Sequence, residues 1–293
     1  MTGRGAIGAP SLRPVTPLDP TLASRPVPSR RTVHPQAFGL GAAADTRDSM
    51  RPIHELEAAA DPTTFDASGP YASFGAAYHS NSDNVRRLLK HIHDGETVRW
   101  REDEQITPNP TWGYYVFLTS YTPVTREKLT RALENLCEVQ THTINVEYTL
   151  PVFADEAIKR FQLDLIDDQS TLVDASDDRV RAEFRAIIRG LNLTDDETVI
   201  PPPARNLICL VLDEPAVDML SDLRLHKGSK RDFAGFESKT IKAIEIRWER
   251  PQRSRSSYRG VGRVSVNGLL RLYNLMTSSN GYMEDLHPSN GVP

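Results

Sequence analysis

The sequence lacks any run of about 18 apolar residues, the length that a helix needs to cross a bilayer. Its N-terminus also lacks the central apolar stretch of a secretory signal peptide. Both absences argue against a membrane-spanning or secreted protein. We therefore expect a soluble intracellular chain that is located in the cytoplasm.

Cysteine is scarce as well, because the 293 residues include only 2. This number is too small for a disulfide scaffold or for a metal site built from four cysteines. Cys137 lies on the apolar side of a predicted helix, and Cys209 lies inside a predicted apolar strand. A buried free cysteine behaves as a small hydrophobic residue, so we expect both thiols in the core.

Short motifs that identify common enzyme active sites are also missing. The chain contains no G-x-S-x-G nucleophile elbow, no G-x-x-x-x-G-K-[ST] phosphate loop and no H-E-x-x-H zinc helix. His91 and His93 are two residues apart, which on a helix points their rings in different directions. The sequence therefore predicts no metal and no cofactor, and it leaves open whether the chain is an enzyme.

Residues 1–75 are rich in proline, glycine, alanine and serine and show no hydrophobic periodicity. Such a segment cannot bury enough apolar area to offset the entropy lost on ordering, so we expect a disordered N-terminal tail. Its first part is rich in arginine and poor in acids, which is also typical of a mitochondrial presequence. The many prolines oppose the amphipathic helix that a presequence needs, so mitochondrial import is the less favoured alternative.

Four later segments have strand-like patterns. Residues 113–121 and 206–212 are apolar on both faces, whereas residues 143–150 and 241–249 alternate between apolar and polar side chains. Alternation predicts one buried face, and continuous apolarity predicts two. We therefore expect 113–121 and 206–212 in the middle of a sheet, with the other two strands at its edges.

A helix is predicted after each of the two apolar strands, with Thr125 as the cap of the first and Asp213 or Glu214 as the cap of the second. The resulting order of elements is the split βαβ pattern of a ferredoxin-like sandwich. We therefore predict one α+β domain with a four-stranded sheet. It spans residues 76–280, with a helical insertion at 151–204, and a flexible tail follows at 281–293.

The second face of the sheet also needs a cover, because its central strands are apolar on both sides. The insertion can supply one, since it contains an amphipathic helix from Val180 to Leu191. A pocket between the sheet and the insertion would suit a small-molecule-binding enzyme, which is one hypothesis for the function. The candidate lining residues are Tyr114, Tyr115, His142, Tyr148 and Trp248.

Two regions of opposite charge favour a different hypothesis. Acidic residues gather between residues 164 and 197, and lysine and arginine gather between residues 224 and 263. The acids match no calcium loop, and several precede a helix, where they favour capping. Opposed acidic and basic surfaces would support self-association or docking to a charged protein. A non-catalytic interaction module is therefore the leading hypothesis.

The basic region is densest at residues 250–263, where Arg250, Arg253, Arg255 and Arg259 alternate with serines and a tyrosine. Arginines bind phosphate groups well, so phosphate or nucleic-acid binding is a third hypothesis. Residues 115–120 are similar to the first strand of an RNA-recognition motif, but the Lys/Arg-Gly-aromatic-Gly-aromatic strand is missing. With a net charge of -4 as well, nucleic-acid binding is the least favoured hypothesis.

Two long stretches, residues 100–136 and 174–191, resemble a group of uncharacterised proteins of filamentous fungi. The PPARN sequence at 202–206 and the WERP sequence at 248–251 add to the resemblance, which extends over about residues 98–260. It implies a eukaryotic intracellular setting and brings no activity, cofactor or catalytic residue with it.

Overall fold

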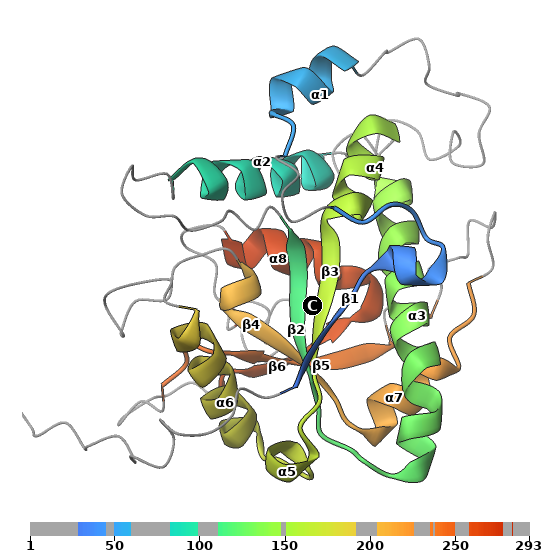
Figure 1. Cartoon of the computed structure of the whole chain (residues 1–293), viewed down its shortest axis with the longest axis vertical. Helices are drawn as coiled ribbons and strands as arrows, with labels where there is room; N and C mark the ends of the chain where they lie inside the picture. The colour runs from blue at the N-terminus through green and yellow to red at the C-terminus, as the bar shows by residue number, and fades with distance from the viewer. Residues whose placement is uncertain are drawn as a thin grey trace, which may run out of the picture.

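The computed structural model describes residues 29–44, 50–59, 83–98, 111–147, 151–191, 204–225, 235–236, 238–249, 258–277 and 283. They form an α+β fold in which helices cover both faces of one mixed sheet (Figure 1). None of the helices in this part of the chain is long and apolar enough to cross a membrane. Predictions for other residues, such as the first 28, lie outside the described residues.

The sheet has six strands in the spatial order β1-β3-β2-β4-β5-β6. β2 runs parallel to both of its neighbours, β3 and β4, and the remaining pairs are antiparallel. The strands are Arg30–Val33 (β1), Trp112–Leu118 (β2), Phe161–Ile166 (β3), Ile208–Leu212 (β4), Thr240–Glu245 (β5) and Val261–Ser265 (β6).

Helices connect the strands and pack against them. The α-helices are Ile53–Ala59 (α1), Asp83–Val98 (α2), Pro123–Glu147 (α3), Pro151–Arg160 (α4), Gln169–Leu172 (α5), Asp177–Gly190 (α6), Glu214–Ser221 (α7) and Leu269–Thr277 (α8). Short 3-10 helices span Pro35–Phe38 (η1), Ala204–Asn206 (η5) and Val266–Gly268 (η6).

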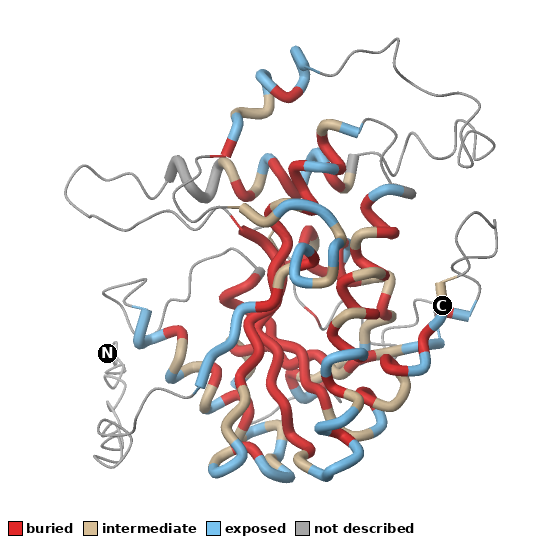
Figure 2. Tube along the Cα trace, turned by 45° about the vertical axis from the view of Figure 1, so that its right-hand side comes forward, coloured by how far each residue is buried: buried red, intermediate tan, exposed pale blue. Residues whose placement is uncertain are grey.

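The two continuously apolar segments form β2 and β4, and both lie inside the sheet as predicted. Every residue of these two strands is buried, which Figure 2 shows as the red centre of the molecule. On one face, the Tyr114 ring contacts the Tyr273 ring of α8. On the other face, the Phe117 ring contacts the Phe184 ring of α6. Continuous apolarity therefore predicted burial on both faces correctly.

The predicted four-stranded ferredoxin-like sheet is wrong, because the sheet has six strands and a different second strand. Residues 143–147, predicted to begin that strand, belong to α3. The strand that follows α3 and α4 is β3, which the sequence analysis placed in the helical insertion. Ile158, Phe161 and Leu165 have helical spacing, but the chain changes from helix to strand after Arg160. The apparent helical pattern therefore ran across a boundary between two elements.

Two crossovers of opposite direction place helices on both faces. The connection from β2 to β3 passes through α3 and α4, and the connection from β3 to β4 passes through α5 and α6. Because β2 lies between β3 and β4, right-handed crossovers in these two directions require opposite faces. Figure 1 shows α3 and α7 on one side of the sheet and α6 on the other.

An N-terminal strap, defined as residues 29–44, contributes β1 and η1, although the sequence analysis assigned it to a disordered tail. β1 pairs with the edge of β3. The strap then reaches α4, where the Ala44 N–H donates to the Lys159 carbonyl at 2.8 Å. Only Val33 of β1 is buried, so no hydrophobic pattern indicated this strand in the sequence.

Candidate functional site

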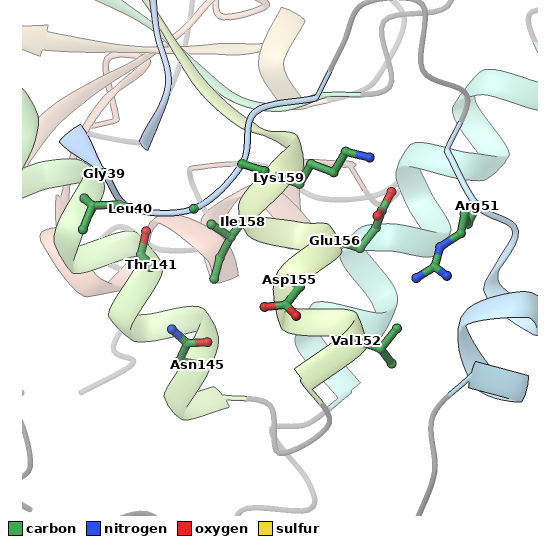
Figure 3. Close-up of a pocket in the computed structure, with 12 residues that line it drawn as sticks. Gly39, Leu40, Arg51, Thr141, Asn145, Val152, Asp155, Glu156, Ile158 and Lys159 are labelled. Carbon is green, nitrogen blue, oxygen red and sulfur yellow. The ribbon is translucent and has the colours of Figure 1, made fainter. Parts of the chain in front are cut away.

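A groove of about 550 Å³ lies between the N-terminal strap and the helices α3 and α4 (Figure 3). Its walls combine small, apolar, charged and amide-bearing residues. The lining residues are Gly39, Leu40, Gly41, Ala42, Arg51, Thr141, Asn145, Val152, Asp155, Glu156, Ile158 and Lys159. The groove therefore joins residues 39–42 of the strap to residues 152–159 of α4, which are more than 100 residues away in the sequence.

Glycines shape the wall that the strap contributes. Gly39 has a φ of 74° and ends η1, and its N–H donates to the carbonyl groups of Pro35 and Gln36. Gly41 has a φ of 105°, and a Cβ there would lie 3.1 Å from Ile158 Cγ2. Because glycine adopts positive φ without strain, the strap turns tightly and passes close to α4.

The charged side chains of the groove lie on two sides of α4. Figure 3 shows Glu156, Lys159 and Arg51 on one side and Asp155 on the side that faces Asn145 of α3. The Glu156 carboxylate accepts hydrogen bonds from Arg160 Nε at 2.9 Å and lies 2.8 Å from Arg160 Nη2. This buried pair neutralises Glu156, whereas Asp155 and Arg51 are exposed.

The carboxyl ends of parallel strands are a common ligand site in sheets with crossovers on both faces. Here the hydroxyl groups after β2 bond to each other: Thr125 Oγ1 lies 3.0 Å from Ser120 Oγ and 2.9 Å from Thr122 Oγ1. Ser120 also donates to Glu214 at 3.5 Å, and Thr122 accepts the Thr125 N–H. Thr122, rather than the predicted Thr125, thus caps α3. These side chains connect β2, α3 and α7 instead of facing a ligand.

A buried charge cluster surrounds Asp164 of β3. Its carboxylate accepts hydrogen bonds from Arg30 and Thr32 of the strap, each at 2.8 Å, and from Arg205 of η5. The guanidinium groups of Arg30 and Arg205 lie 5.3 and 5.2 Å from the centre of the Tyr115 ring. Burial lowers the pKa of the Arg205 guanidinium. Because the charges have partners within the cluster, we interpret it as a structural connection between the strap, β3 and β4.

Arg181 of α6 bonds to the end of β5 and to the residues just before β6. Its Nε donates to the Glu245 carbonyl and its Nη2 to the Arg259 carbonyl, both at 3.0 Å. The guanidinium also lies 4.8 Å from the Trp248 ring centre. A Cβ on Gly260 would lie 2.4 Å from Trp248 Cβ, so only glycine fits there. Arg259 is exposed, and the predicted phosphate-binding residues Arg250, Arg253 and Arg255 lie outside the described residues.

The structure does not bring the predicted pocket residues together. Tyr114 and Tyr115 point to opposite faces of the sheet, and the Tyr114 hydroxyl donates to the Leu269 carbonyl at 2.7 Å. His142 is buried in α3, and Trp248 packs against Arg181. Tyr148 lies outside the described residues. None of the four described residues among them lines the groove.

The acidic and basic regions contact each other at one described ion pair. Lys242 Nζ of β5 lies 3.0 Å from Asp177 Oδ1 of α6. Asp164 is in the interior rather than on an acidic surface. One described pair therefore joins the two regions, and the opposed acidic and basic surfaces stay a prediction.

Asp213 caps α7, as predicted, and Asp168 caps α5, whereas the cap of α6 is Ser176 rather than one of the acids around it. Asp213 accepts the Ala216 N–H at the start of α7, and Asp168 accepts the Ser170 N–H at the start of α5. Hydrogen bonds from the Ser170 hydroxyl are the main reason why the pKa of Asp168 is lowered. Within the described ranges, no group of three or more potential metal ligands is close enough to hold an ion.

Comparison of the chain with protein-family models, with curated proteins and with solved structures finds no match. The resemblance to proteins of filamentous fungi therefore stays a prediction.

The sequence analysis missed the groove because both of its walls were assigned to other structures. The strap lay within the predicted disordered tail, and α4 lay at the start of the predicted helical insertion. One signal was present in the sequence: Gly39 and Gly41 flank a single leucine, a spacing typical of a tight turn.

Proposed function

We propose that this chain binds a small polar molecule in the groove between the N-terminal strap, α3 and α4. The observation that supports the proposal is the groove itself, whose volume of about 550 Å³ is within the usual range for ligand sites. Its lining is more polar than that of most such sites, and it places the apolar side chains Leu40, Val152 and Ile158 beside charged and amide groups that fix a ligand's orientation.

Binding fits the lining residues better than catalysis does. The described lining includes no histidine, cysteine or serine, so it contains no pair of a serine or cysteine nucleophile with a histidine base. Asp155 and Lys159 are exposed or half-exposed, which suits recognition of a polar ligand more than the tuned pKa values of acid–base catalysis.

A variant that fills the groove tests this proposal. Ala42 is exposed on the strap and lines the groove, so Ala42→Trp should block it without disturbing the core. Ala37→Trp is the matched control, because Ala37 is equally exposed on the strap but does not line the groove. The full chain is screened by ligand-observed NMR against amino acids, short peptides, sugars, polyols and sugar phosphates.

We expect at least one compound class to bind the wild type and Ala37→Trp. The affinity of Ala42→Trp should be lower by about tenfold or more, since the indole competes for the same volume. The proposal fails if no class binds, or if Ala42→Trp binds as tightly as the control.

A further inference from the structure

Helix α4 separates the cations of the groove from Asp155. Among the described lining residues, the cations are Arg51 and Lys159, and Figure 3 shows both on the side of α4 that faces away from α3. Asp155 lies on the other side, where it faces α3. We name the part of the groove that is bordered by Asn145 of α3 and by Asp155 and Ile158 of α4 the α3 side of the groove.

Asp155 supplies hydrogen-bond acceptors to the α3 side. It is exposed, and within the described ranges no ion pair connects it to another residue. The rest of α4 is packed, because every residue of this helix except Pro151 and Asp155 is buried or half-buried. The helix is also fixed to β2, since Trp112 Nε1 donates to the Ala157 carbonyl at 2.7 Å. A well-anchored helix therefore presents an accessible carboxylate.

Hydrogen-bond donors come from α3 and from the strap. Asn145 is exposed on α3 and faces Asp155, and its amide group can both donate and accept (Figure 3). Gly41 and Ala42 line the groove, and no described residue accepts a hydrogen bond from the N–H group of either. The α3 side of the groove and the adjoining strap therefore offer donors as well as acceptors.

An apolar surface lies beside these polar groups. Ile158 is three residues after Asp155, so the two side chains are on the same side of α4 (Figure 3). The strap passes close to Ile158 at Gly41, where a Cβ would lie 3.1 Å from Ile158 Cγ2. A ligand that carries C–H groups next to polar groups can contact both kinds of surface.

The mixture of donors and acceptors distinguishes between classes of ligand. An anion could accept from the N–H groups, but Asp155 would repel it. An ammonium group could donate to Asp155, but it would leave the N–H groups of Asn145 and Gly41 without an acceptor. A hydroxyl group both donates and accepts, so several neighbouring hydroxyl groups can match all of these partners.

Building on the function proposed above, we propose that the ligand is a neutral polyhydroxylated molecule, a monosaccharide or a cyclic polyol. Its hydroxyl groups donate to the Asp155 carboxylate, exchange hydrogen bonds with the Asn145 amide and accept from the N–H groups of Gly41 and Ala42. Its C–H groups lie against Ile158.

Ring compounds with different functional groups test the inference by ligand-observed NMR titration of the full chain. The polyols are myo-inositol, glucose, galactose and mannose. Cyclohexylamine and cyclohexanecarboxylate are the comparison compounds, because each combines a similar ring with one charged group. At least one polyol should bind about threefold or more tightly than either comparison compound, since hydroxyl groups match more of the donors and acceptors.

Two variants assign the contacts. Asp155→Asn removes the charged acceptor, and Asn145→Ala removes the amide, so each should weaken polyol binding by about threefold. Both positions are exposed, so the thermal midpoint of unfolding should stay nearly unchanged. Glu127→Gln, at an exposed position of α3 outside the groove, is the control and should leave polyol affinity unchanged.

The outcomes separate this inference from the function on which it is built. If a comparison compound binds as tightly as the best polyol or more tightly, and Ala42→Trp abolishes its binding, the polyol is overturned and the groove remains a binding site. Absence of polyol binding would also overturn the inference, and the other compound classes of the screen would then decide the proposed function. Polyol binding that neither Asp155→Asn nor Asn145→Ala weakens would overturn the proposed contacts, and if Ala42→Trp also left it unchanged, the proposed function would fail as well.

Discussion

Tyr114 and Tyr115 are neighbours in β2, yet they lie in opposite chemical environments. Tyr114 is on the face covered by α8, among the rings of Trp112 and Tyr273, and its hydroxyl donates to a backbone carbonyl. Tyr115 is on the face covered by α6, beneath two guanidinium groups that pair with Asp164. The immediate contacts of Tyr114 are thus neutral, whereas those of Tyr115 also include charges, and we name the surroundings of the two rings the neutral and the charged face.

The difference shows how the same degree of burial can depend on different interactions. Neutral aromatic packing loses stability in proportion to the atoms removed. A buried ion pair behaves differently, because removal of one partner leaves the other as an uncompensated charge. Variants on the two faces should therefore lose different amounts of stability, even where the same number of atoms is changed.

The largest effect is expected at Gly113, which precedes both tyrosines and brings β2 close to β3. Its φ is 125°, and a Cβ would lie 1.9 Å from the Gln162 carbonyl oxygen. Gly113→Ala should therefore separate the two strands and lower the free energy of unfolding by about 4 kcal/mol or more, as measured in urea. Gly190→Ala is the control, because a Cβ there meets no atom within 4 Å. Similar stability of the two variants would contradict this account of the sheet.

The next largest effect is expected on the charged face. Asp164→Asn removes the carboxylate that pairs with Arg30 and Arg205 and should lower the free energy of unfolding by about 3 to 5 kcal/mol. Asp167→Asn, three residues further along the chain, breaks only a partly exposed pair with Arg126 and should cost less than about 1 kcal/mol. Equal costs for the two substitutions would show that the buried cluster does not depend on its charge.

Asp164 also illustrates how far the sequence could predict this fold. Continuous apolarity correctly located β2 and β4, because burial on both faces depends on nothing outside those segments. β3 was missed because Phe161 and Leu165 form a helical spacing with Ile158, although Phe161, Leu163 and Leu165 alternate with polar residues as in a strand. The burial of the polar residues Gln162 and Asp164 depends on Arg30 and Arg205. These arginines come from segments 134 and 41 residues away from Asp164, and a local pattern cannot report partners so distant.

The groove was hidden for the same reason. Its strap holds few buried side chains, and its position depends on hydrogen bonds to α4 rather than on a hydrophobic pattern. The residues that line a site can be recognised in a sequence only when the helices and strands that carry them have been located. The sequence did not locate α4, because residues 143–147 were predicted to begin a strand and instead belong to the 25-residue helix α3.

The free energy of unfolding, measured as a function of pH, tests the two buried thiols. Cys137 lies on α3, and Cys209 lies on β4. Burial raises the pKa of Cys137 from 9.0 to about 12, and it raises the pKa of Cys209 as well. Below about pH 9 both thiols are protonated in the folded and unfolded chains, so their contribution to stability is complete. Above this pH, Cys137 ionises in the unfolded chain before it ionises in the folded chain. The free energy of unfolding therefore falls until the pH reaches the pKa of the folded state.

The expected loss from Cys137 is about 2 kcal/mol between pH 9 and pH 11. It is measured by urea unfolding of the wild type and of Cys137→Ala at several pH values. The stability of the variant should decline less steeply with pH than the stability of the wild type. Parallel declines would show that this thiol ionises freely in the folded chain.

The smallest effect is expected on the neutral face, where Tyr114→Phe removes only a hydroxyl group. The Leu269 carbonyl would lose its donor in a fully buried position, so the substitution should cost about 1 kcal/mol. Tyr121→Phe is the matched control, because the Tyr121 hydroxyl donates to the Leu118 carbonyl at 2.9 Å but is only half-buried. Water can replace that donor, and the ring still lies under Arg126, so the control should cost less than about 0.5 kcal/mol. If Tyr114→Phe cost as much as Asp164→Asn, the contrast between a neutral and a charged face would not hold.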